Sequence, residues 1–227
     1  MEQTIVVVPQ AIELQPFVRS LATMGYRGQG LTVGRLNCTS IDGLGLVCAV
    51  GGHGKTQLAV HTQHLIERLP DAVAVICAGA AGGLADDIAR GDVVVGTSCV
   101  EHDFKRRFSR SPAPCHYPHE PTIARFRAAT HALRGGFAVH FGAIAGGDED
   151  IVHRDRAREL RKETGALCVA WEGAGAARAA LFNGLPFAEV RAVTDSADED
   201  ASADFHASLE TVMPHLAQVL ARWAQTT

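Results

Sequence analysis

The sequence has no closely spaced cysteine pairs, no long hydrophobic run and no excess of charge of one sign. No window approaches the roughly 18 uninterrupted apolar residues that a membrane-spanning helix needs, which excludes such a span. With 21 Lys and Arg against 25 Asp and Glu, the net charge is −4. This balance gives no general attraction to nucleic acid or to an anionic membrane, so a small neutral or modestly charged ligand is favoured.

The six cysteines lie far apart and form no C-x-x-C pair, and several stand in apolar runs such as VCAV, VICAG and ALCVA. A free thiol in such a run behaves as a small buried hydrophobe. The N-terminal MEQTIVVVPQ has no positively charged region and only a short apolar run, so we expect no signal peptide. The pattern predicts reduced thiols and a cytoplasmic protein.

The chain of 227 residues is 47% hydrophobic and contains no repeat or low-complexity linker. At about 150 residues per domain we expect a single domain over residues 1–227. The apolar fraction excludes a disordered chain, and glycines without a strict period exclude a collagen-like one.

Short β-branched runs alternate with longer segments of helical periodicity. The predicted strands are residues 4–8, 44–50, 72–78, 92–100, 138–144, 166–169 and 187–193, and the predicted helices are residues 13–24, 55–68, 122–133, 154–164, 173–183 and 202–224. Runs such as IVVV and VAVIC are apolar on both faces. The alternation predicts a three-layer α/β sandwich around a central mixed, largely parallel sheet.

A proline-rich segment, residues 105–121, interrupts the alternation and reads as a long ordered loop or flap. Its Cys115, His116 and His119 form a small cluster, but no second ligand pair accompanies them, so a structural or gating loop is favoured over a metal site. His102-Asp103, which follows a predicted strand, could orient a loop.

Two glycine-rich loops follow predicted strands, where ligands of open α/β sheets bind. GGHGKT (51–56) ends like a phosphate-binding loop, but Ala49 stands where that motif has its first glycine. A tight turn, an anion or sugar contact and a triphosphatase remain alternatives. AGAAGGL (78–84) lets the backbone approach a ligand closely, and close packing is the alternative.

Three acidic residues stand near predicted strand ends. Glu172 lies where a strand turns into a helix of small residues. It can bind sugar hydroxyls, or it can be an ordinary acid at a helix N-terminus, where the helix dipole favours a negative charge. Asp195 ends the strand AEVRAVTD and is a candidate general acid or a helix cap. Glu13, at the start of the first helix, is a candidate base or an ordinary first-turn acid.

Several motifs in order resemble the nucleoside phosphorylase/hydrolase superfamily, and most closely the methylthioadenosine/S-adenosylhomocysteine nucleosidases. The resemblance covers nearly the whole chain. It rests on AGAAGGLADDIARGDVVVG (78–96) with His102-Asp103 after it, on LPFAEVRAVTDSAD (185–198), on WEGAGAA and on GGHGK.

The resemblance implies a nucleoside phosphorylase-like fold and cleavage of the glycosidic bond of a purine nucleoside. Asp195 would protonate the base, Glu172 would hold the ribose hydroxyls, Glu13 would activate water and Arg191 would support the site electrostatically. The remaining residues expected to bind substrate are Gly79, Ala80 and Trp171. The resemblance further implies no metal or organic cofactor, and a homodimer.

Similar phosphorylases carry an arginine just before the central glycine loop to hold phosphate, where this chain has the apolar VAVICAG. This difference favours water as the nucleophile, and a phosphate-dependent phosphorylase is the alternative. The chain departs from similar nucleosidases at Ala80, where they have serine, at Trp171, and at Asp150, where an aromatic residue is expected. These departures leave the base and the 5′ substituent open, and a futalosine hydrolase-like enzyme is a further alternative. The flap, with Phe104, Phe108 and Tyr117, is expected to cover the sugar pocket.

Two readings from other classes compete with a nucleosidase. In one, the glycine loops form a regulatory module that binds a nucleotide without turnover. In the other, Gly54-Lys55-Thr56 serves a triphosphatase.

Overall fold

The computed structural model describes residues 2–109, 111–131, 133 and 135–226. Its strands are β1 (Gln3–Val8), β2 (Gln29–Val33), β3 (Leu36–Ile41), β4 (Leu46–Val50), β5 (Ala72–Gly83), β6 (Val93–Glu101), β7 (Cys115–His116), β8 (Val139–Gly146), β9 (Cys168–Ala170) and β10 (Phe187–Asp195). Its helices are α1 (Ala11–Thr23), α2 (Lys55–Arg68), α3 (Glu120–Thr130), α4 (Arg154–Thr164), α5 (Gly173–Phe182) and α6 (Ala201–Gln225), with a short 3₁₀ turn η1 (Asp42–Leu44).

All strands belong to one mixed sheet in the order β10-β6-β8-β9-β5-β1-β4-β3-β2, with β7 paired to β6. Parallel pairing joins β4, β1, β5 and β10, and also joins β6, β8 and β9. Because β10 pairs with β5 as well as with β6, the first five strands of this order close into a ring. The predicted mixed α/β sheet is confirmed, and the ring is a feature that the sequence did not indicate.

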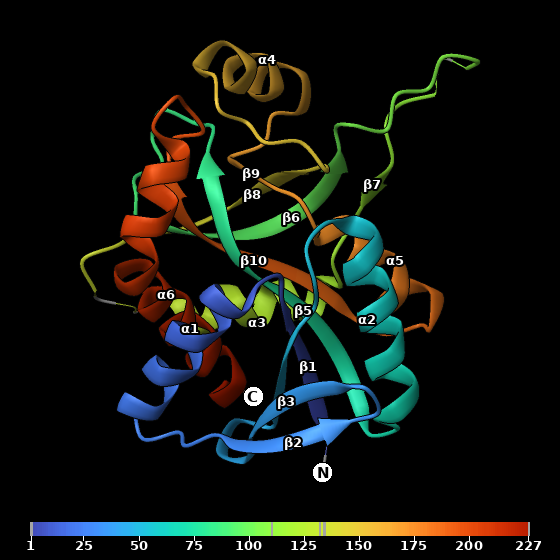
Figure 1. Ribbon diagram of the computed structural model, residues 1–227, viewed down its shortest axis with the longest axis vertical. Coiled ribbons are helices and arrows are strands. Elements are labelled where there is room, and N and C mark those ends of the chain that lie inside the picture. Colours follow the sequence, from blue (N-terminus) through green and yellow to red (C-terminus); the bar gives the residue numbers. More distant parts are fainter. Residues whose placement is uncertain (1, 110, 132, 134, 227) are drawn as a thin grey trace.

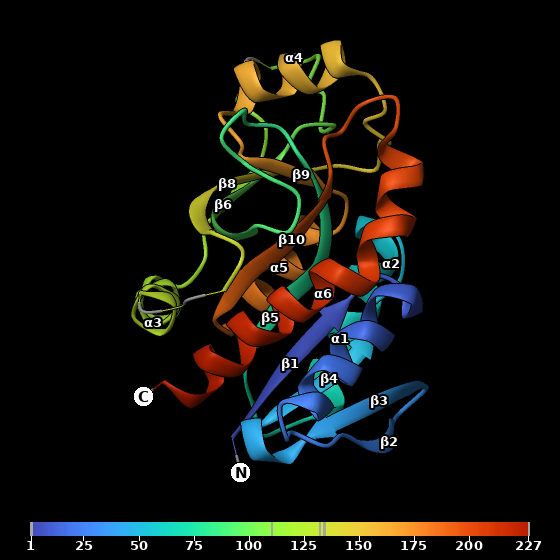
Figure 2. The ribbon, with the colours of Figure 1, turned by 90° about the vertical axis from the view of Figure 1, so that its left-hand side faces the viewer.

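Helices cover both sides of the sheet (Figures 1 and 2). Residues 5–8 of strand β1 are all apolar because both faces of the strand are buried there. Val6 and Val8 pack into a core with residues of α1, α3 and α6, whereas Ile5 and Val7 pack into a second core with residues of α2 and α5. A strand buried on both faces needs no polar alternation, as the run IVVV predicts.

The predicted bounds of α2 and α4 agree with the structure, and the other predicted helices are displaced by up to three residues at their ends. The hairpin β2–β3 was not predicted. It lies at the edge of the sheet, several of its side chains are exposed, and it therefore lacks the continuous apolar run of a central strand.

Among the described residues no helix is both long and apolar enough to cross a bilayer. All six cysteines are free thiols, and five of them are buried.

Helices α2 and α5 are in close contact because α5 begins with small residues. A Cβ atom added to Gly175 would lie 2.2 Å from the backbone oxygen of Lys55 and 3.2 Å from the backbone nitrogen of Ala59. Neither backbone atom can move away without separating the helices. This contact fixes the position of the loop between β9 and α5, which carries Glu172.

We expect Gly175→Ala to lower the free energy of unfolding by about 1–3 kcal/mol, because the added methyl group forces α5 away from α2. Denaturant unfolding would measure this loss. The matched control is Gly30→Ala on the exposed β2, where nothing lies within 4 Å of the added Cβ, and its effect should stay below about 1 kcal/mol. Equal stability of the two variants would contradict the close packing of α2 and α5.

Candidate active site

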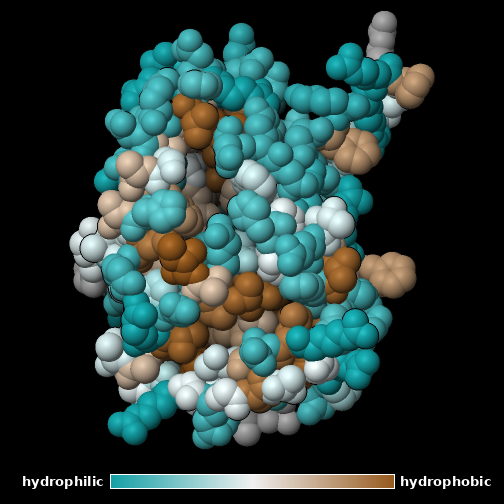
Figure 3. Space-filling view, in the orientation of Figure 1, coloured by the Kyte–Doolittle hydropathy of each residue, from teal (hydrophilic) through white to brown (hydrophobic). Residues whose placement is uncertain are grey.

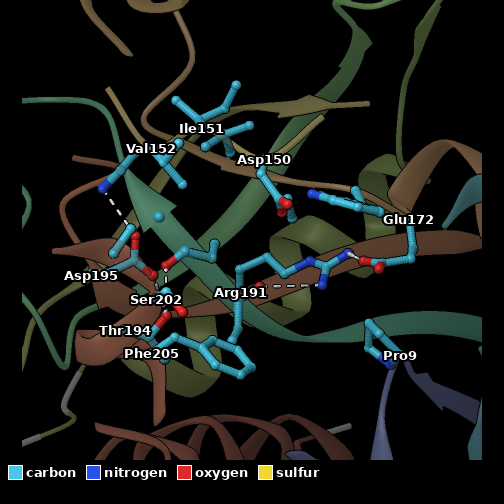
Figure 4. A pocket seen from close by; sticks show the side chains of 18 of the residues that line it. Pro9, Asp150, Ile151, Val152, Glu172, Arg191, Thr194, Asp195, Ser202 and Phe205 are labelled. Atoms are coloured by element: carbon cyan, nitrogen blue, oxygen red, sulfur yellow. Dashed lines mark hydrogen bonds and ion pairs between the residues drawn. The ribbon is translucent and has the colours of Figure 1, made fainter. Parts of the chain in front are cut away.

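A cavity of about 270 Å³ lies where the carboxyl ends of β1, β5, β9 and β10 meet. The molecule is hollowed in the upper half of the face shown in Figure 3. Five of the residues predicted from the sequence to act at a site line this cavity together with Arg191, namely Glu13, Ala80, Trp171, Glu172 and Asp195. Figure 4 shows Arg191 extended toward Glu172 on one side, with Thr194 and Asp195 on the other.

Glu13 reaches the cavity from the first turn of α1 and is 2% exposed. Its Oε2 accepts a hydrogen bond of 2.7 Å from the backbone N–H of Ala80. The pKa of Glu13 is raised from its ordinary 4.5 to about 7: burial is the main cause and the nearby Glu172 adds to it, while the Ala80 bond and Arg191 act in the opposite direction. Such a carboxyl can take up or release a proton near neutral pH.

Glu172 immediately precedes α5 and is 4% exposed. Its Oε2 lies 3.3 Å from Nη2 of Arg191, and its Oε1 accepts a hydrogen bond of 3.4 Å from the backbone N–H of Gly54. Gly54 belongs to the first glycine loop, so this loop positions a carboxylate.

Asp195 is the last residue of β10 and is 8% exposed. Thr194 Oγ1 donates to its Oδ2 at 2.7 Å, and the backbone N–H of Ala197 donates to its Oδ1 at 2.9 Å. Burial raises the pKa of Asp195, and the two hydrogen bonds partly oppose this shift. Ala197, whose N–H makes the second of these bonds, has a positive φ of 50°.

Gly79 does not line the cavity but stands behind it. A Cβ atom there would lie 2.6 Å from Oε2 of Glu13 and 3.0 Å from Nη1 of Arg191. Residues 78–83, which were expected to form a glycine-rich loop, are instead the end of β5, because they pair with β10. Their small side chains leave room for charged side chains, and Ala80 contributes both its N–H and its carbonyl to them.

His53, in the first glycine loop, also lines the cavity, although the sequence did not single it out. Its ring centroid is 4.2 Å from that of Trp171, and its Nδ1 is 3.8 Å from Oε1 of Glu172. The only sequence signal was its place in a glycine loop after a strand. Asp150, Ile151 and Val152 form another part of the wall.

The flap, residues 105–121 with Phe104, was expected to cover the pocket, but in this chain it does not cover the cavity described above. None of the described flap residues lines it, and Phe104, Phe108 and Tyr117 are exposed. In Figure 1 the flap extends outward from β6 and β7. The proline-rich segment follows the carboxyl end of β6, and its described residues contribute nothing to the cavity wall.

Lys55 of the GGHGKT loop does not line the cavity either. Its Nζ lies 2.5 Å from Oδ1 of Asp103, and the other carboxylate oxygen of Asp103 accepts a hydrogen bond from the backbone N–H of Asp148. Asp103 thus ties down the loop that continues into Asp150, in line with the expected orienting role of His102-Asp103. Within the described part of the chain, no three His, Cys, Asp or Glu side chains are placed to hold a metal ion.

Residues 4–225 match the phosphorylase superfamily. The chain is 30% identical over 188 residues to the 5′-methylthioadenosine/S-adenosylhomocysteine nucleosidase of Geobacillus thermodenitrificans, covering 79% of each chain. It is 28% identical over 165 residues to the nucleosidase of the same name from Thermotoga maritima, covering 73% of this chain and 72% of the relative.

Solved structures of related proteins are similar to this chain over nearly its whole length. The nucleosidase of Neisseria meningitidis in complex with methylthio-immucillin-A superposes with a TM-score of 0.85 at 28% identity, over 98% of each chain. The futalosine hydrolase of Helicobacter pylori superposes with a TM-score of 0.84 at 23% identity, over 99% of this chain and 97% of the other, which shows a shared fold.

We expect the stability of Glu13→Gln relative to the wild type to depend on pH. Because the folded protein raises the pKa of Glu13 from 4.5 to about 7, its contribution to stability is complete below about pH 4.5 and is lost as the pH rises to about 7. The free energy of unfolding of the glutamine variant should therefore rise relative to that of the wild type by up to about 3 kcal/mol across this interval. Above about pH 7 the difference should stay constant.

Urea unfolding at a series of pH values would measure this difference. Glu120→Gln, at an exposed carboxylate outside the cavity, is the control and should follow the wild type. Parallel stability curves for Glu13→Gln and the wild type would show that Glu13 takes up no extra proton on folding.

Proposed function

The chain belongs to the phosphorylase superfamily, and from this premise we propose that it hydrolyses the N-glycosidic bond of a purine nucleoside, of the methylthioadenosine or S-adenosylhomocysteine type, and releases the free base. The observation that carries the proposal is the meeting of Glu13, the Glu172–Arg191 pair and Asp195 around one cavity. They come from three separate segments of the chain and supply the three functions that glycosidic cleavage requires.

Asp195 acts as the general acid. Burial favours its protonated form, and Thr194 and the N–H of Ala197 hold its two oxygens in place. Transfer of this proton to the imidazole ring of the purine turns the base into a neutral leaving group, so the C1′–N9 bond can break without expelling an anion.

Glu172 accepts hydrogen bonds from the ribose hydroxyls. As the bond to the base breaks, the sugar acquires positive charge, and a carboxylate in a buried site stabilises this charge strongly because little water screens it. Trp171 and Ala80 form part of the surrounding wall, and Gly79 lies behind it.

Glu13 removes a proton from the attacking water. It must be ionised to do so, and its pKa of about 7 makes the ionised form available at neutral pH. The reactive form of the enzyme therefore carries a proton on Asp195 and none on Glu13, and activity falls as Glu13 becomes protonated.

Water is the nucleophile in this proposal because the described residues of the site offer no arginine or lysine that is free to hold phosphate. Among the described residues that line the cavity, Arg191 is the only arginine or lysine. Its N–H groups are directed to Glu189, Glu172, the Ala80 carbonyl and the Cys77 sulfur. A phosphate dianion would meet acidic side chains instead, since Glu149 and Asp150 line the cavity together with Glu13, Glu172 and Asp195.

The test is release of base from methylthioadenosine, S-adenosylhomocysteine, adenosine, inosine and futalosine, each with and without phosphate. We expect release that does not depend on phosphate and is fastest with a substrate of the first two kinds. Phosphate-dependent release would identify a phosphorylase, fastest release from futalosine would identify a futalosine hydrolase, and no release from any substrate would overturn the proposal.

Asp195→Asn is the matched variant for this assay. It keeps the shape of the side chain but removes the acidic proton, so kcat should fall by about 10²–10⁴-fold while a substrate analogue still binds. A regulatory module without turnover would show binding in both proteins and base release in neither.

The proposal includes a homodimer in the cytoplasm. The six free thiols are compatible with a reducing compartment. Exposed apolar side chains, Phe104, Phe108 and Tyr117 of the flap, Val60 of α2, and Leu181 and Phe182 of α5, lie on elements that Figure 1 shows on one side of the molecule. A second copy that covers this side would remove them from water.

Light scattering coupled to gel filtration should give twice the mass of the chain. Phe182→Ser should increase the monomer fraction, because Phe182 is 84% exposed on the proposed interface. Met24→Ser, at the end of α1 away from that side, is the control. A monomer with full activity would contradict the dimer.

A further inference from the structure

Glu189 is a buried carboxylate that belongs to no part of the cavity wall. It lies in the middle of β10, is 2% exposed and does not line the cavity. Its Oε2 has no nitrogen or hydroxyl donor among the described residues, and the thiol of Cys99 on β6, a weak donor, faces this carboxylate. A carboxylate so poorly paired in the interior costs free energy, so this side chain needs a specific reason to be there.

The neighbour that explains it is Arg191. The two side chains are two residues apart on the same face of β10. Arg191 Nε donates to Glu189 Oε1 at 2.9 Å, which is the shortest bond of this guanidinium. Its other bonds are longer, 3.3 Å to Glu172 Oε2, 3.3 Å to the Ala80 carbonyl and 3.4 Å to the Cys77 sulfur.

Arg191 is 1% exposed, and a guanidinium stays charged in any protein environment. A buried charge requires a counterion within hydrogen-bonding distance. Glu172 could serve, but it lines the cavity and, on the function proposed above, must turn its oxygens to the ribose hydroxyls. A counterion outside the cavity removes this conflict.

We propose that Glu189 is the permanent counterion of Arg191, a positioning residue that leaves the carboxylate of Glu172 free to bind the ribose. The inference rests on the proposed function. Space for the Glu189 carboxylate is provided by Gly173, where an added Cβ atom would lie 2.0 Å from its Oε2.

The influence of Glu189 extends to Glu13 through Arg191. The charged groups that face Glu13 are Glu172 at the start of α5 and Arg191 on β10, and the N–H groups of Ala80 and Gln10 also face it. The Ala80 peptide accepts from Arg191 through its carbonyl and donates to Glu13 through its N–H. When Glu189 loses its charge, the field of Arg191 is less compensated, and the ionised form of Glu13 is favoured.

Glu189→Gln tests the charge while keeping an oxygen that can accept from Arg191 Nε. In this variant Arg191 should pair more closely with Glu172, so KM should rise about tenfold while kcat changes less than about threefold. The acid limb of the kcat profile, which reports Glu13, should move down by about one pH unit. If Glu189 had only a structural role, its replacement by glutamine would lower the melting temperature and leave KM and the acid limb unchanged.

The matched control is Glu101→Gln. Glu101 is equally buried and also pairs with an arginine, since Arg178 Nη2 lies 2.5 Å from its Oε1, but it has no contact with Arg191. This variant should be less stable than the wild type, with KM and the acid limb at wild-type values.

A second measurement does not depend on activity or on the folding of Glu189→Gln. Carboxyl-carbon NMR of protein labelled with ¹³C-glutamate follows the Glu13 carboxyl group, and Glu189→Asp, which keeps the negative charge, is the second variant. We expect Glu13 to titrate near pH 7 in the wild type and at the same pH in Glu189→Asp.

A Glu13 titration that shifts in Glu189→Asp, or unchanged KM and Glu13 titration in Glu189→Gln, would overturn the inference. If the wild type releases no base from any nucleoside, the proposed function fails, and the NMR titration alone decides whether Glu189 is the counterion.

Discussion

The burial of one guanidinium group constrains the rest of this structure. Arg191 is 1% exposed, and several kcal/mol would be needed to remove its charge from water without partners. Its partners come from β5, from the residue before α5 and from β10 itself. Three segments that are far apart in the sequence must therefore assemble together before the charge can be buried. The same assembly brings two pocket carboxylates, Glu13 and Glu172, close to each other.

The ring of strands makes this assembly possible. Strand β10 lies beside β5 in a register that places Arg191 opposite Gly79 and Asp195 opposite Gly82. A Cβ atom on Gly82 would lie 2.8 Å from Oδ1 of Asp195, so each charged side chain extends over a glycine of the neighbouring strand. The small residues at the end of β5 are thus a packing requirement of the charged residues next to them.

Sequence reasoning located the parts of the site that follow from strand ends. Glu13, Glu172 and Asp195 each stand next to an apolar run, and such positions meet at one edge of an α/β sheet. His53 and Trp171 are far apart in the sequence, and nothing local indicates that their rings come into contact. Glu189 was also missed, because an acid two residues from an arginine in a strand is normally read as a solvent-facing pair. Similarly, the path of the flap depends on where β6 ends, which its proline content does not reveal.

The close contact between Gly173 and Glu189 also limits the order in which substitutions at these two positions can be accepted during evolution. The Glu189 carboxylate fills the space that any side chain at position 173 would occupy, and its bond to Arg191 holds it there. Position 173 can therefore accept a larger residue only after the residue at position 189 has been replaced by a shorter one. If position 173 changed first, the intermediate protein would have a steric clash. The two positions are linked in evolutionary history, and descendants that keep the acid are expected to inherit the glycine with it.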